Sequence, residues 1–449
     1  MHSASPTLAT HQIVMISIGG VIGAGLFVGS AKAIAQAGPL ALAAYTAAAL
    51  LMLCVMWVLA ELATARPDLG SFSVYADSTL GRWAGFSVGW LYWWYYLLLM
   101  AIESLAAGHI VHGWVPTVPE WLAAAAVIIV MMGCNCLSVR AFGQAEYGLS
   151  FIKVIAIVAF LAVGTLTVTG IVPHHSSIGL SLLTDHGGFA PNGWAAGVSA
   201  FLIALFSFQG CEIATIAAAE SDHPIRNVRA SMRAVVWRIT LFYLGSILLV
   251  LCLVPWNSPL LNQGAYQAAL QVIGIPGASV LMDAVIFTAV ISCLNSALYT
   301  ASRMAWSLSK RGDAPAQWKV LSVRHTPWKA IVSTAVVALA IIMAHLVFPS
   351  RYMEFLLNSG GAAILLVYCS ILASQLIARR KWPSATHDQI CVPGYPWFSA
   401  VVLVMMASVF AIMAFMPEQR SVLGTTLALT AVLVTIGLLR HRGATNSPT

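Results

Sequence analysis

The segment Ser17–Ser30, SIGGVIGAGLFVGS, holds five glycines among fourteen mostly apolar residues near the start of the chain. Glycine costs about 1 kcal/mol relative to alanine in a helix interior, so this segment is a weak helix. The pairs Gly19/Gly23 and Gly25/Gly29 also match G-x-x-x-G, the spacing that lets membrane helices pack closely. The segment is therefore either a helix-packing surface or a membrane helix that unwinds at its glycines.

The composition indicates an integral membrane protein. Of the 449 residues, 60% are hydrophobic and 8% are charged, against about 25% charged residues in soluble domains. Apolar runs of about 20 residues, enough for a helix to cross the bilayer, recur along the whole chain, and no pattern of alternating strands competes with them. We predict an all-α polytopic protein with twelve membrane-spanning helices, at residues 12–36, 39–65, 84–113, 119–138, 145–171, 194–219, 234–255, 277–308, 328–348, 352–378, 395–416 and 421–440.

The basic residues predict the orientation of these spans. With the N-terminus inside, eighteen of the 22 Lys and Arg residues fall at cytoplasmic ends and loops, Arg238 among them. Lys32, Arg351 and Arg420 fall outside, and Lys153 lies within a span. This positive-inside bias predicts an inner-membrane protein with both termini in the cytoplasm. It also explains the net charge of +7 by membrane topology and contact with lipid rather than by binding of nucleic acid. Residues 1–11 lack the basic region of a signal peptide, so we expect the first span to direct insertion.

A second irregular span lies five spans after the first. Residues 204–212, ALFSFQGCE, place polar residues and Gly210 in the middle of span 6. Because five is odd, spans 1 and 6 cross the bilayer in opposite directions, and paired interrupted helices are typical of inverted-repeat transporters. We expect one membrane domain, since no long polar linker interrupts the spans. Its repeats would cover about residues 12–171 and 194–378, followed by two peripheral helices at about 395–440.

The two breaks suggest where a zwitterionic ligand would bind. Backbone N–H groups at the start of a half-helix, from about Gly23 to Phe27, suit a carboxylate. Carbonyls at the end of the first half of span 6, from about Ala204 to Phe208, suit a cationic amine. Phe206 and Phe208 would line such a site, although core packing explains these phenylalanines equally well.

Five ionisable side chains are recognised within the spans: Glu61, Glu103, Lys153, Glu212 and Asp283. A charge at mid-membrane costs about 2.5–3.5 kcal/mol or more, so each is a candidate for function. We expect Glu61 to pair with an arginine or a helix end, and Asp283 to lie in the first turn of its span. Lys153 either extends to the interface or gains and loses a proton during transport. Glu103 and Glu212 are the candidate partners for a substrate amine or a coupled proton.

Other features are interpreted as structure. The aromatic run in span 3 is read as a packing surface or interfacial belt, and residues 71–80 as a cytoplasmic interfacial helix. The cysteines are expected to be free thiols, and the histidines of the 172–193 loop to be a chance cluster. No P-loop, zinc cluster or Ser/His/Asp signature is recognisable, so we expect neither an enzyme nor a cofactor or metal site. The aromatic run comprises Trp90, Tyr92, Trp93, Trp94, Tyr95 and Tyr96.

Several motifs together resemble the bacterial amino acid permeases of the amino acid–polyamine–organocation superfamily. They are Gly20–Ser30 (GVIGAGLFVGS), Pro67–Phe72 (PDLGSF), Gly85–Trp94 (GFSVGWLYWW), Phe206–Glu212 (FSFQGCE), Ala217–Pro224 (AAAESDHP), Ser292–Arg303 (SCLNSALYTASR) and Gly312–Pro315 (GDAP). The likeness extends from about residue 11 to the C-terminus. Within the superfamily it is nearest to the 4-aminobutyrate (GABA) permeases, notably at residues 216–222, 292–303 and 355–361.

The resemblance implies a core of ten helices in an inverted repeat, two added helices, and alternating access. It places the substrate carboxylate at Ile22, Gly23, Ala24, Gly25 and Leu26, and the amine at Phe206, Ser207 and Phe208. It also implies that the Lys153 ammonium stands between spans 1, 5 and 8, where sodium-coupled relatives hold a cation. Gln209, Cys211 and the Ala101-Ile102 pair before Glu103 depart from the GABA-permease pattern beside the expected pocket.

We therefore predict proton-coupled import of a small zwitterionic amino acid, with Lys153 and Glu212 in proton coupling. GABA or a related ω-amino acid is favoured over an α-amino acid, and a non-transporting amino acid sensor is the remaining alternative. The separation between the span 1 amides and either Glu103 or the span 6 carbonyls would have to match that between the substrate's carboxylate and amine.

Overall fold

The computed structural model describes residues 22–66, 71–137, 139–171, 178–208, 210–212, 224–323, 326–344, 346, 352–382 and 390–441. Helices dominate these ranges, and no strand occurs within them. Each of the twelve predicted spans contains helical residues. Within the described ranges, eight helical segments are long and apolar enough to cross a membrane, and three shorter apolar helices accompany them.

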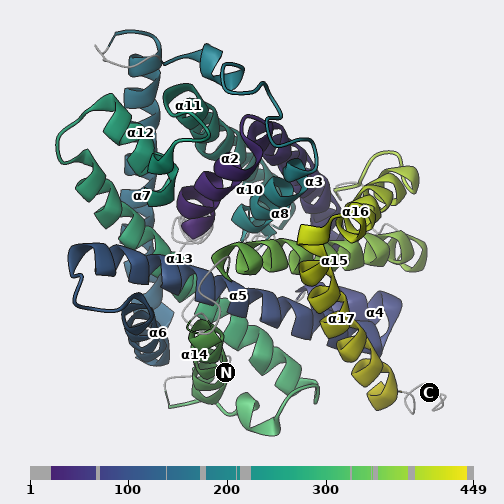
Figure 1. The fold of residues 1–449 in the computed structure, drawn as a ribbon. Helices are drawn as coiled ribbons and strands as arrows, with labels where there is room; N and C mark the ends of the chain where they lie inside the picture. The colour runs from purple at the N-terminus through teal and green to yellow at the C-terminus, as the bar shows by residue number, and fades with distance from the viewer. Residues whose placement is uncertain are drawn as a thin grey trace.

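The first half of the chain supplies the helices nearest the site. The π-helix η1 (Gly25–Gly29) continues into α2 (Ser30–Ala37), and the next long helices are α3 (Leu40–Ala65), α5 (Arg82–Trp114) and α7 (Val139–Val168). Helix α5 packs against α6 (Glu120–Leu137), α13 (Ala278–Lys310), α15 (Tyr352–Lys381) and α4 (Ser71–Leu80). Figure 1 shows α5 and α15 crossing the middle of the molecule. Helix α5 is therefore in a position to contribute side chains to the interior.

The second half begins with a short helix that ends inside the protein. Helix α8 (Ala196–Ser207) packs against α2, α3 and α15. The following span combines α10 (Pro224–Arg238), the π-helix η3 (Ile239–Leu244) and α11 (Gly245–Leu253). Helix α14 (Trp328–Ala344) packs against α6. The short elements are η2 (Leu180–Leu183), η4 (Pro259–Gln263), α12 (Ala265–Ile273), η5 (Ala316–Lys319) and η6 (Pro417–Gln419).

Close contacts at glycine bring α8 and α15 together. A Cβ atom on Gly360 of α15 would lie 2.6 Å from Cδ2 of Phe206, and one on Gly361 would overlap the carbonyl of Leu202. Small residues permit this approach between membrane helices. The two glycines therefore fix α15 against the helix that ends at the span 6 break.

Helix α4 confirms the helix expected at residues 71–80, but its inner face is buried. Phe72 and Tyr75 are each 2% exposed, and α4 packs against both α5 and α15. The Tyr75 hydroxyl donates to the Arg66 carbonyl at 2.8 Å. This face of α4 therefore packs on other helices, while the place of α4 relative to the membrane stays a prediction.

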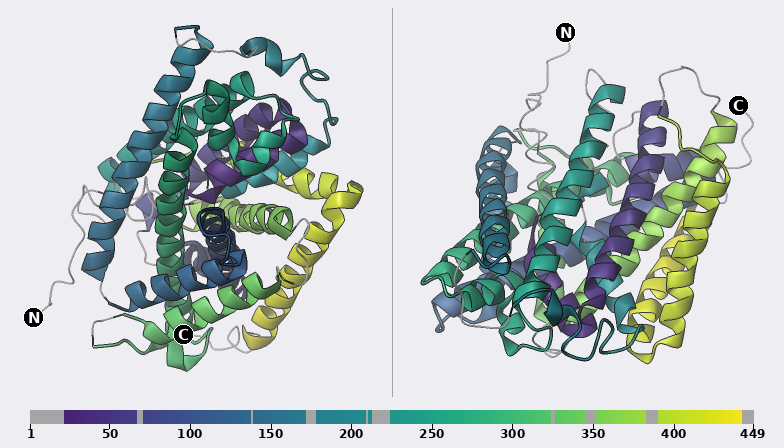
Figure 2. Two further views of the ribbon diagram at one scale, coloured as in Figure 1. Left: turned by 60° about the vertical axis from the view of Figure 1, so that its left-hand side comes forward. Right: turned by 90° about the horizontal axis from the view of Figure 1, so that it is seen from above.

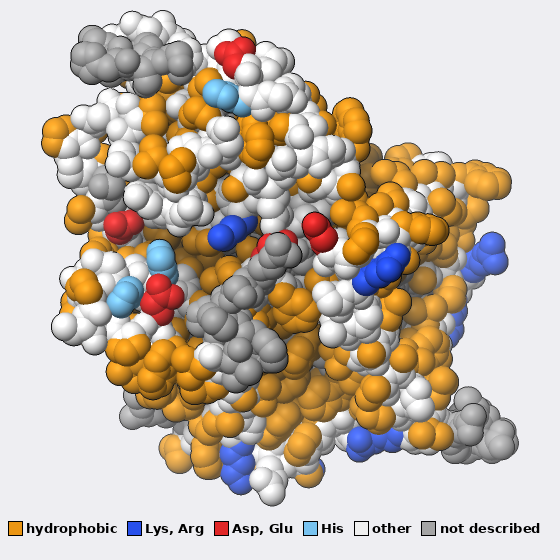
Figure 3. All heavy atoms as spheres, viewed as in Figure 1, with side chains coloured by type: hydrophobic (Ala, Val, Ile, Leu, Met, Phe, Trp, Pro, Cys, Tyr) orange, Lys and Arg blue, Asp and Glu red, His pale blue; other side chains and the backbone are white. Residues whose placement is uncertain are grey.

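The last two helices lie at one side of the molecule, as Figures 1 and 2 show. They are α16 (Trp397–Phe415) and α17 (Arg420–His441), and both leave many apolar side chains exposed. Figure 3 likewise shows apolar side chains over much of the visible face. Such exposed apolar surface fits contact with lipid.

An ionic cluster ties the end of α17 to the loop after α13. Asp313, which is 3% exposed, lies 3.8 Å from nitrogens of both Arg82 and Arg311 and 3.2 Å from Nε2 of His441. Arg440 donates to the Gly312 carbonyl at 2.5 Å. We call Arg82, Arg311, Asp313 and His441 the Asp313 cluster.

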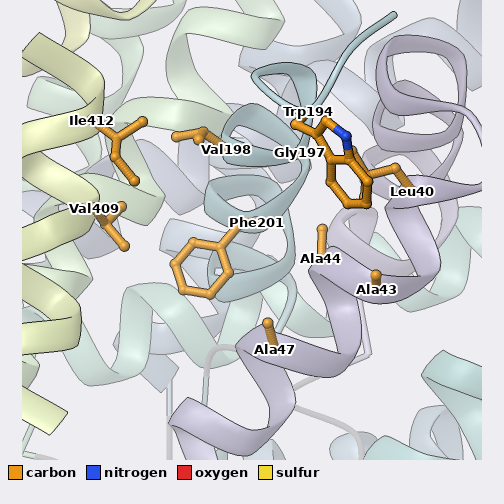
Figure 4. A pocket seen from close by; sticks show the side chains of 10 residues that line it. All are labelled: Leu40, Ala43, Ala44, Ala47, Trp194, Gly197, Val198, Phe201, Val409 and Ile412. Carbon is orange, nitrogen blue, oxygen red and sulfur yellow. The ribbon is translucent and has the colours of Figure 1, made fainter. Parts of the chain in front are cut away.

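A cavity of about 260 Å³ lies between α3, α8 and α16, away from the helix breaks. Its lining side chains are apolar apart from the indole N–H of Trp194, as Figure 4 shows. It offers no charged group to a zwitterionic ligand, so the polar groups at the helix breaks are the better candidates for a binding site.

Candidate substrate and proton site

The described part of span 1 begins with Ile22 and Gly23, which are not helical, and its helix begins at Ala24. We refer to Ile22 and Gly23 as the span 1 break, because the sequence predicts unwinding there. The Leu26 N–H bonds the Gly23 carbonyl at 3.2 Å. A Cβ atom on Gly23 would lie 2.8 Å from Sγ of Cys293 and would overlap the Glu103 carboxylate. Glycine is therefore needed at residue 23 for close approach by two neighbouring side chains.

The two interpretations of the glycine segment apply to different residues. A Cβ atom on Gly25 would lie 2.7 Å from Cα of Ser207, and one on Gly29 would lie 3.2 Å from Cγ2 of Ile203. The Gly25/Gly29 pair is thus a packing surface for α8, as G-x-x-x-G predicts, whereas the non-helical backbone lies just before it. Gly19 and Gly20 fall outside the described residues.

The span 6 break follows Ser207, where α8 ends. Gly210 has φ 82°, a left-handed conformation that glycine adopts readily. This confirms Gly210 as a point of interruption. Gln209, a predicted binding residue, lies outside the described residues.

Ser207 joins the two breaks. Its Oγ donates to the Gly25 carbonyl at 2.8 Å and lies 3.2 Å from the Tyr45 hydroxyl. Its own carbonyl accepts from the Tyr243 hydroxyl at 2.7 Å. Because a carbonyl oxygen has two lone pairs, the Ser207 carbonyl keeps the capacity to accept another donor.

Both predicted phenylalanines are buried among aromatic rings. The Phe206 ring centroid lies 6.4 Å from that of Tyr95. The Phe208 ring lies 5.0 Å from Tyr243 and 5.9 Å from Tyr45, both edge-on. These contacts satisfy the packing interpretation and place both rings at the end of α8.

Glu103 binds the span 1 break directly. Its side chain, 1% exposed, accepts the Ala24 N–H with both carboxylate oxygens, at 3.0 and 2.9 Å. The separation between the span 1 amides and Glu103, which the sequence did not give, is thus a direct hydrogen bond. The break holds a carboxylate supplied by the protein.

Lys153 lies where three spans meet. Its Nζ donates to the Ile22 carbonyl at 3.1 Å and to Oγ of Ser292 on α13 at 2.9 Å. The side chain is fully buried, so it does not extend to the interface. These contacts join span 1, span 5 and span 8, the arrangement that the resemblance implies.

Glu146 is a buried acid that the sequence reasoning missed. It is 0% exposed, and its Oε1 accepts a hydrogen bond from Ser292 Oγ. Glu146 and Lys153 lie seven residues apart, so they share one face of α7. This spacing was visible in the sequence, but Glu146 stands next to the predicted start of its span and was not counted among the intramembrane acids.

Glu212 lies beside the aromatic run of α5. The Tyr92 hydroxyl donates to Glu212 Oε1 at 3.3 Å and lies 3.1 Å from the Tyr96 hydroxyl. Tyr92 is buried among aromatic rings, as the packing interpretation expects, and its hydroxyl in addition bonds Glu212. Tyr92, Tyr96 and Glu103 follow one another at spacings of four and seven residues, which puts them on one helical face.

Cys211 is bound by an arginine that the sequence analysis placed at the cytoplasmic end of a span. Arg238 is 4% exposed, and its Nη2 donates to Cys211 Sγ at 3.0 Å. Arg238 is buried within the apolar segment Val228–Leu253, which begins six residues before the predicted span. Cys211 and Glu212 thus lie beside a buried cation.

Buried acids and a buried lysine beside non-helical backbone at Gly23 and Gly210 agree with comparison to known proteins. The model of the amino acid permease family matches residues 12–442. The chain belongs to this family. Permeases are transporters rather than enzymes, and the apolar helices make this permease a multi-pass protein of the bacterial inner membrane.

Three relatives illustrate the range of substrates named among similar proteins. A probable GABA permease of Pseudomonas aeruginosa is 45% identical, covering 98% of this permease and 93% of the relative. The gamma-aminobutyric acid permease of Escherichia coli is 44% identical over 98% and 95% of the two chains. An aromatic amino acid transport protein of Corynebacterium glutamicum is 38% identical over 92% and 90%.

The two remaining acids that were predicted within the spans, Glu61 and Asp283, have structural partners. Glu61 lies 3.6 Å from Nε of Arg379 and accepts hydrogen bonds from Gln375 and the Val392 N–H, which confirms the expected arginine partner. Asp283 accepts from Gln267 at 3.0 Å. It is the sixth residue of α13, so its predicted place in the first turn is wrong. All eight cysteines are free thiols, as expected.

Proposed function

We propose that this permease imports a small zwitterionic amino acid by proton symport with alternating access. GABA or a related ω-amino acid is the favoured substrate. In this proposal twelve helices span the membrane, the first ten form an inverted repeat, the last two are peripheral, and both termini lie in the cytoplasm. The distribution of basic residues supports the orientation, and the breaks before Ala24 and after Ser207 support the repeat.

The observation that carries the proposal is the hydrogen bonding of Ala24 to Glu103. An exposed N–H at the beginning of a helix favours an anion, and this one already holds a carboxylate with both oxygens. A substrate carboxylate would take the same place among Ile22–Leu26 once Glu103 moves away. Substrate and Glu103 would then compete for one N–H group.

The substrate amine would bind at the end of α8. Carbonyl oxygens suit an ammonium, and the Ser207 carbonyl lies at the break beside the rings of Phe206 and Phe208. Gln209, Cys211 and the displaced Glu103 would border the amine. Gly25 and Ser207 are in contact, so the two proposed subsites would lie against each other and would limit the bulk of a ligand between them.

Charge counting supports proton coupling. Lys153, Glu103 and Glu146 are buried, and they carry a net charge of −1 when all three are ionised. Since buried net charge is costly in a membrane, a proton on one carboxylate would neutralise the group. Glu212, beside Tyr92, is a second place where a proton would bind, and buried Arg238 lies near it. Sodium is not required by this scheme because Lys153 supplies the cation.

The substrate alternatives differ in the separation between carboxylate and amine. Two relatives are named for GABA and one for aromatic amino acids, so import of an α-amino acid is the second candidate. The partners of the permease would be the amino acid, protons and membrane lipid. A non-transporting sensor finds less support, since the site combines helix breaks with a buried Lys–Glu pair.

Uptake into proteoliposomes tests the proposal. The purified permease would be supplied with radiolabelled GABA, with and without an inward proton gradient, and with unlabelled amino acids as competitors. Gradient-driven accumulation of GABA, blocked best by ω-amino acids, is expected. Accumulation that depends on sodium and does not respond to pH would contradict proton coupling. Stronger competition by α-amino acids would show that the substrate is an α-amino acid rather than GABA.

A further inference from the structure

Six polar side chains form two facing stripes on α7 and α13. Glu146, Ser150 and Lys153 follow at spacings of four and three residues on α7, and each is 0% exposed. On α13 the corresponding side chains are Ser292, Asn295 and Ser296, and the last two lie three and four residues after Ser292, spacings that put each of them on the same helical face as Ser292. We call these six residues the α7–α13 stripe.

The stripe extends from Lys153 toward one end of the membrane domain. Glu146 lies seven residues before Lys153, about 10 Å along the helix axis. Asn295 on α13 accepts a hydrogen bond from Asn135 at 2.6 Å, and Asn135 lies two residues before the end of α6, where the chain turns into α7. Glu146 and Asn295 are therefore nearer than Lys153 to the end of the domain that holds Arg140 and Lys310. The basic residues assign that end to the cytoplasm.

Hydrogen bonds already connect the members in one donor direction. Lys153 Nζ donates to Ser292 Oγ at 2.9 Å, and Ser292 Oγ donates to Glu146 Oε1. The titratable groups that face Lys153 are Glu146, Glu103 and the Cys293 thiol, while Lys153 is the charged group that faces Glu146. Glu146 is thus joined to Lys153 through Ser292, whereas the Ala24 N–H is held by a different carboxylate, that of Glu103.

We propose that Glu146 is the acceptor through which Lys153 delivers the transported proton to the cytoplasmic side. The Lys153 ammonium gives a proton to Ser292 Oγ as the Ser292 hydroxyl passes its own proton to Glu146 Oε1. One N–H bond and one O–H bond break, and two O–H bonds form. The products are a neutral Lys153 amine, an unchanged Ser292 and a neutral Glu146 acid, so charges of +1 and −1 become zero. Glu146 then releases the proton to the cytoplasm.

This inference rests on the proposed proton symport and adds the route by which the proton leaves. It assigns Ser292 a chemical task that alanine cannot perform, because the hydroxyl both accepts and donates. Threonine retains that hydroxyl. Glu146→Gln keeps the size of the side chain but removes its ability to receive a proton as a carboxylate.

The test compares three measurements in proteoliposomes. Wild type, Glu146→Gln, Ser292→Ala and Ser292→Thr would be assayed for gradient-driven GABA accumulation, for proton entry recorded by an internal pH dye, and for GABA counterflow at equal pH. Counterflow exchanges labelled for unlabelled substrate, and it needs no release of the proton. Asp283→Asn, a carboxylate-to-amide change on α13 outside the stripe, is the matched control.

Glu146→Gln and Ser292→Ala are expected to lose at least tenfold in accumulation and proton entry while counterflow stays within about threefold of wild type. Ser292→Thr and Asp283→Asn should behave as wild type. Wild-type accumulation by Glu146→Gln would overturn the inference, as would a parallel loss of counterflow in a folded variant, which indicates a structural role. If Glu146→Gln does not fold, the inference is tested by Ser292→Ala and Ser292→Thr: it requires that the alanine variant loses accumulation and proton entry and that the threonine variant keeps both. A wild type that ignores the proton gradient would instead refute the proposed symport itself.

Discussion

Glu103 and Ala24 form a contact in which both oxygens of a buried carboxylate accept the same backbone N–H, at 3.0 and 2.9 Å. The N–H belongs to the first helical residue after the span 1 break. A side chain of α5 thereby covers the group that would otherwise bind a substrate carboxylate. Release of Glu103 and binding of substrate become two halves of one exchange.

Glu103→Gln should therefore bind GABA more tightly. A hydrogen bond that involves a charged group contributes about 1 kcal/mol more than a neutral one, so the uncharged side chain should be displaced more easily and the affinity should rise about fivefold. The pH dependence of binding should also flatten between pH 5 and 8. Calorimetric titration of the purified permease measures both effects, with Asp283→Asn as the control. A fall in affinity would instead show that the displaced Glu103 contributes more as a partner of the substrate amine than as a competitor for the Ala24 N–H.

Lys153→Ala should abolish accumulation against a gradient while retaining measurable binding of GABA. Alanine carries no proton, and its introduction leaves Glu146 without the buried ammonium. Loss of one member of a buried ion pair costs about 3–5 kcal/mol, so thermal unfolding in detergent should also shift downward. The double variant Lys153→Ala/Glu146→Ala should recover part of this stability without recovering accumulation. Unaltered accumulation by Lys153→Ala would remove the lysine from the mechanism.

Gly25→Ala should disrupt the contact between the two breaks. The added methyl group would lie 2.7 Å from Cα of Ser207, and backbone must move to accept it, at a cost of about 1–3 kcal/mol. We expect GABA uptake to fall at least tenfold. Gly424→Ala on α17 is the matched control, since a Cβ atom there meets nothing within 4 Å. Equal uptake by the two variants would show that the close approach at Gly25 is dispensable.

Asp313→Asn should loosen the C-terminal helix. The amide keeps the shape of the side chain but leaves Arg82, Arg311 and His441 without their shared carboxylate, which costs about 1–3 kcal/mol for a buried group. The unfolding temperature should fall, and cleavage by a protease near residue 441 should become faster. Asp185→Asn, an exposed residue, should change neither property. If both variants were cleaved by the protease at the same rate, the attachment of α17 to the loop after α13 would depend on Arg440 alone.

Much of the helical pattern was predictable because a bilayer imposes length and polarity on each span. Gly210 likewise identified the interruption of span 6, and the glycines of SIGGVIGAGLFVGS pointed to the non-helical Ile22 and Gly23, since glycine is the residue that permits such backbone. The residues that contact these segments were harder to predict from the sequence. Glu103 contacts Ala24 across 79 residues of sequence, and a local pattern cannot give such a distance. Arg238 and Glu146 were misjudged for a simpler reason, because each stands near a predicted span boundary, where a shift of a few residues decides between headgroup and interior.

The attachment of α17 to the loop after α13 has a practical consequence. Arg440 and His441 hold Gly312 and Asp313, while Ser292 of the same α13 contacts Lys153. A rotation of α13 during the transport cycle would be carried to the lipid-facing rim through these last two side chains. A fluorophore on Leu439, which is 62% exposed, would report the change in state of the permease without entering the path of the substrate.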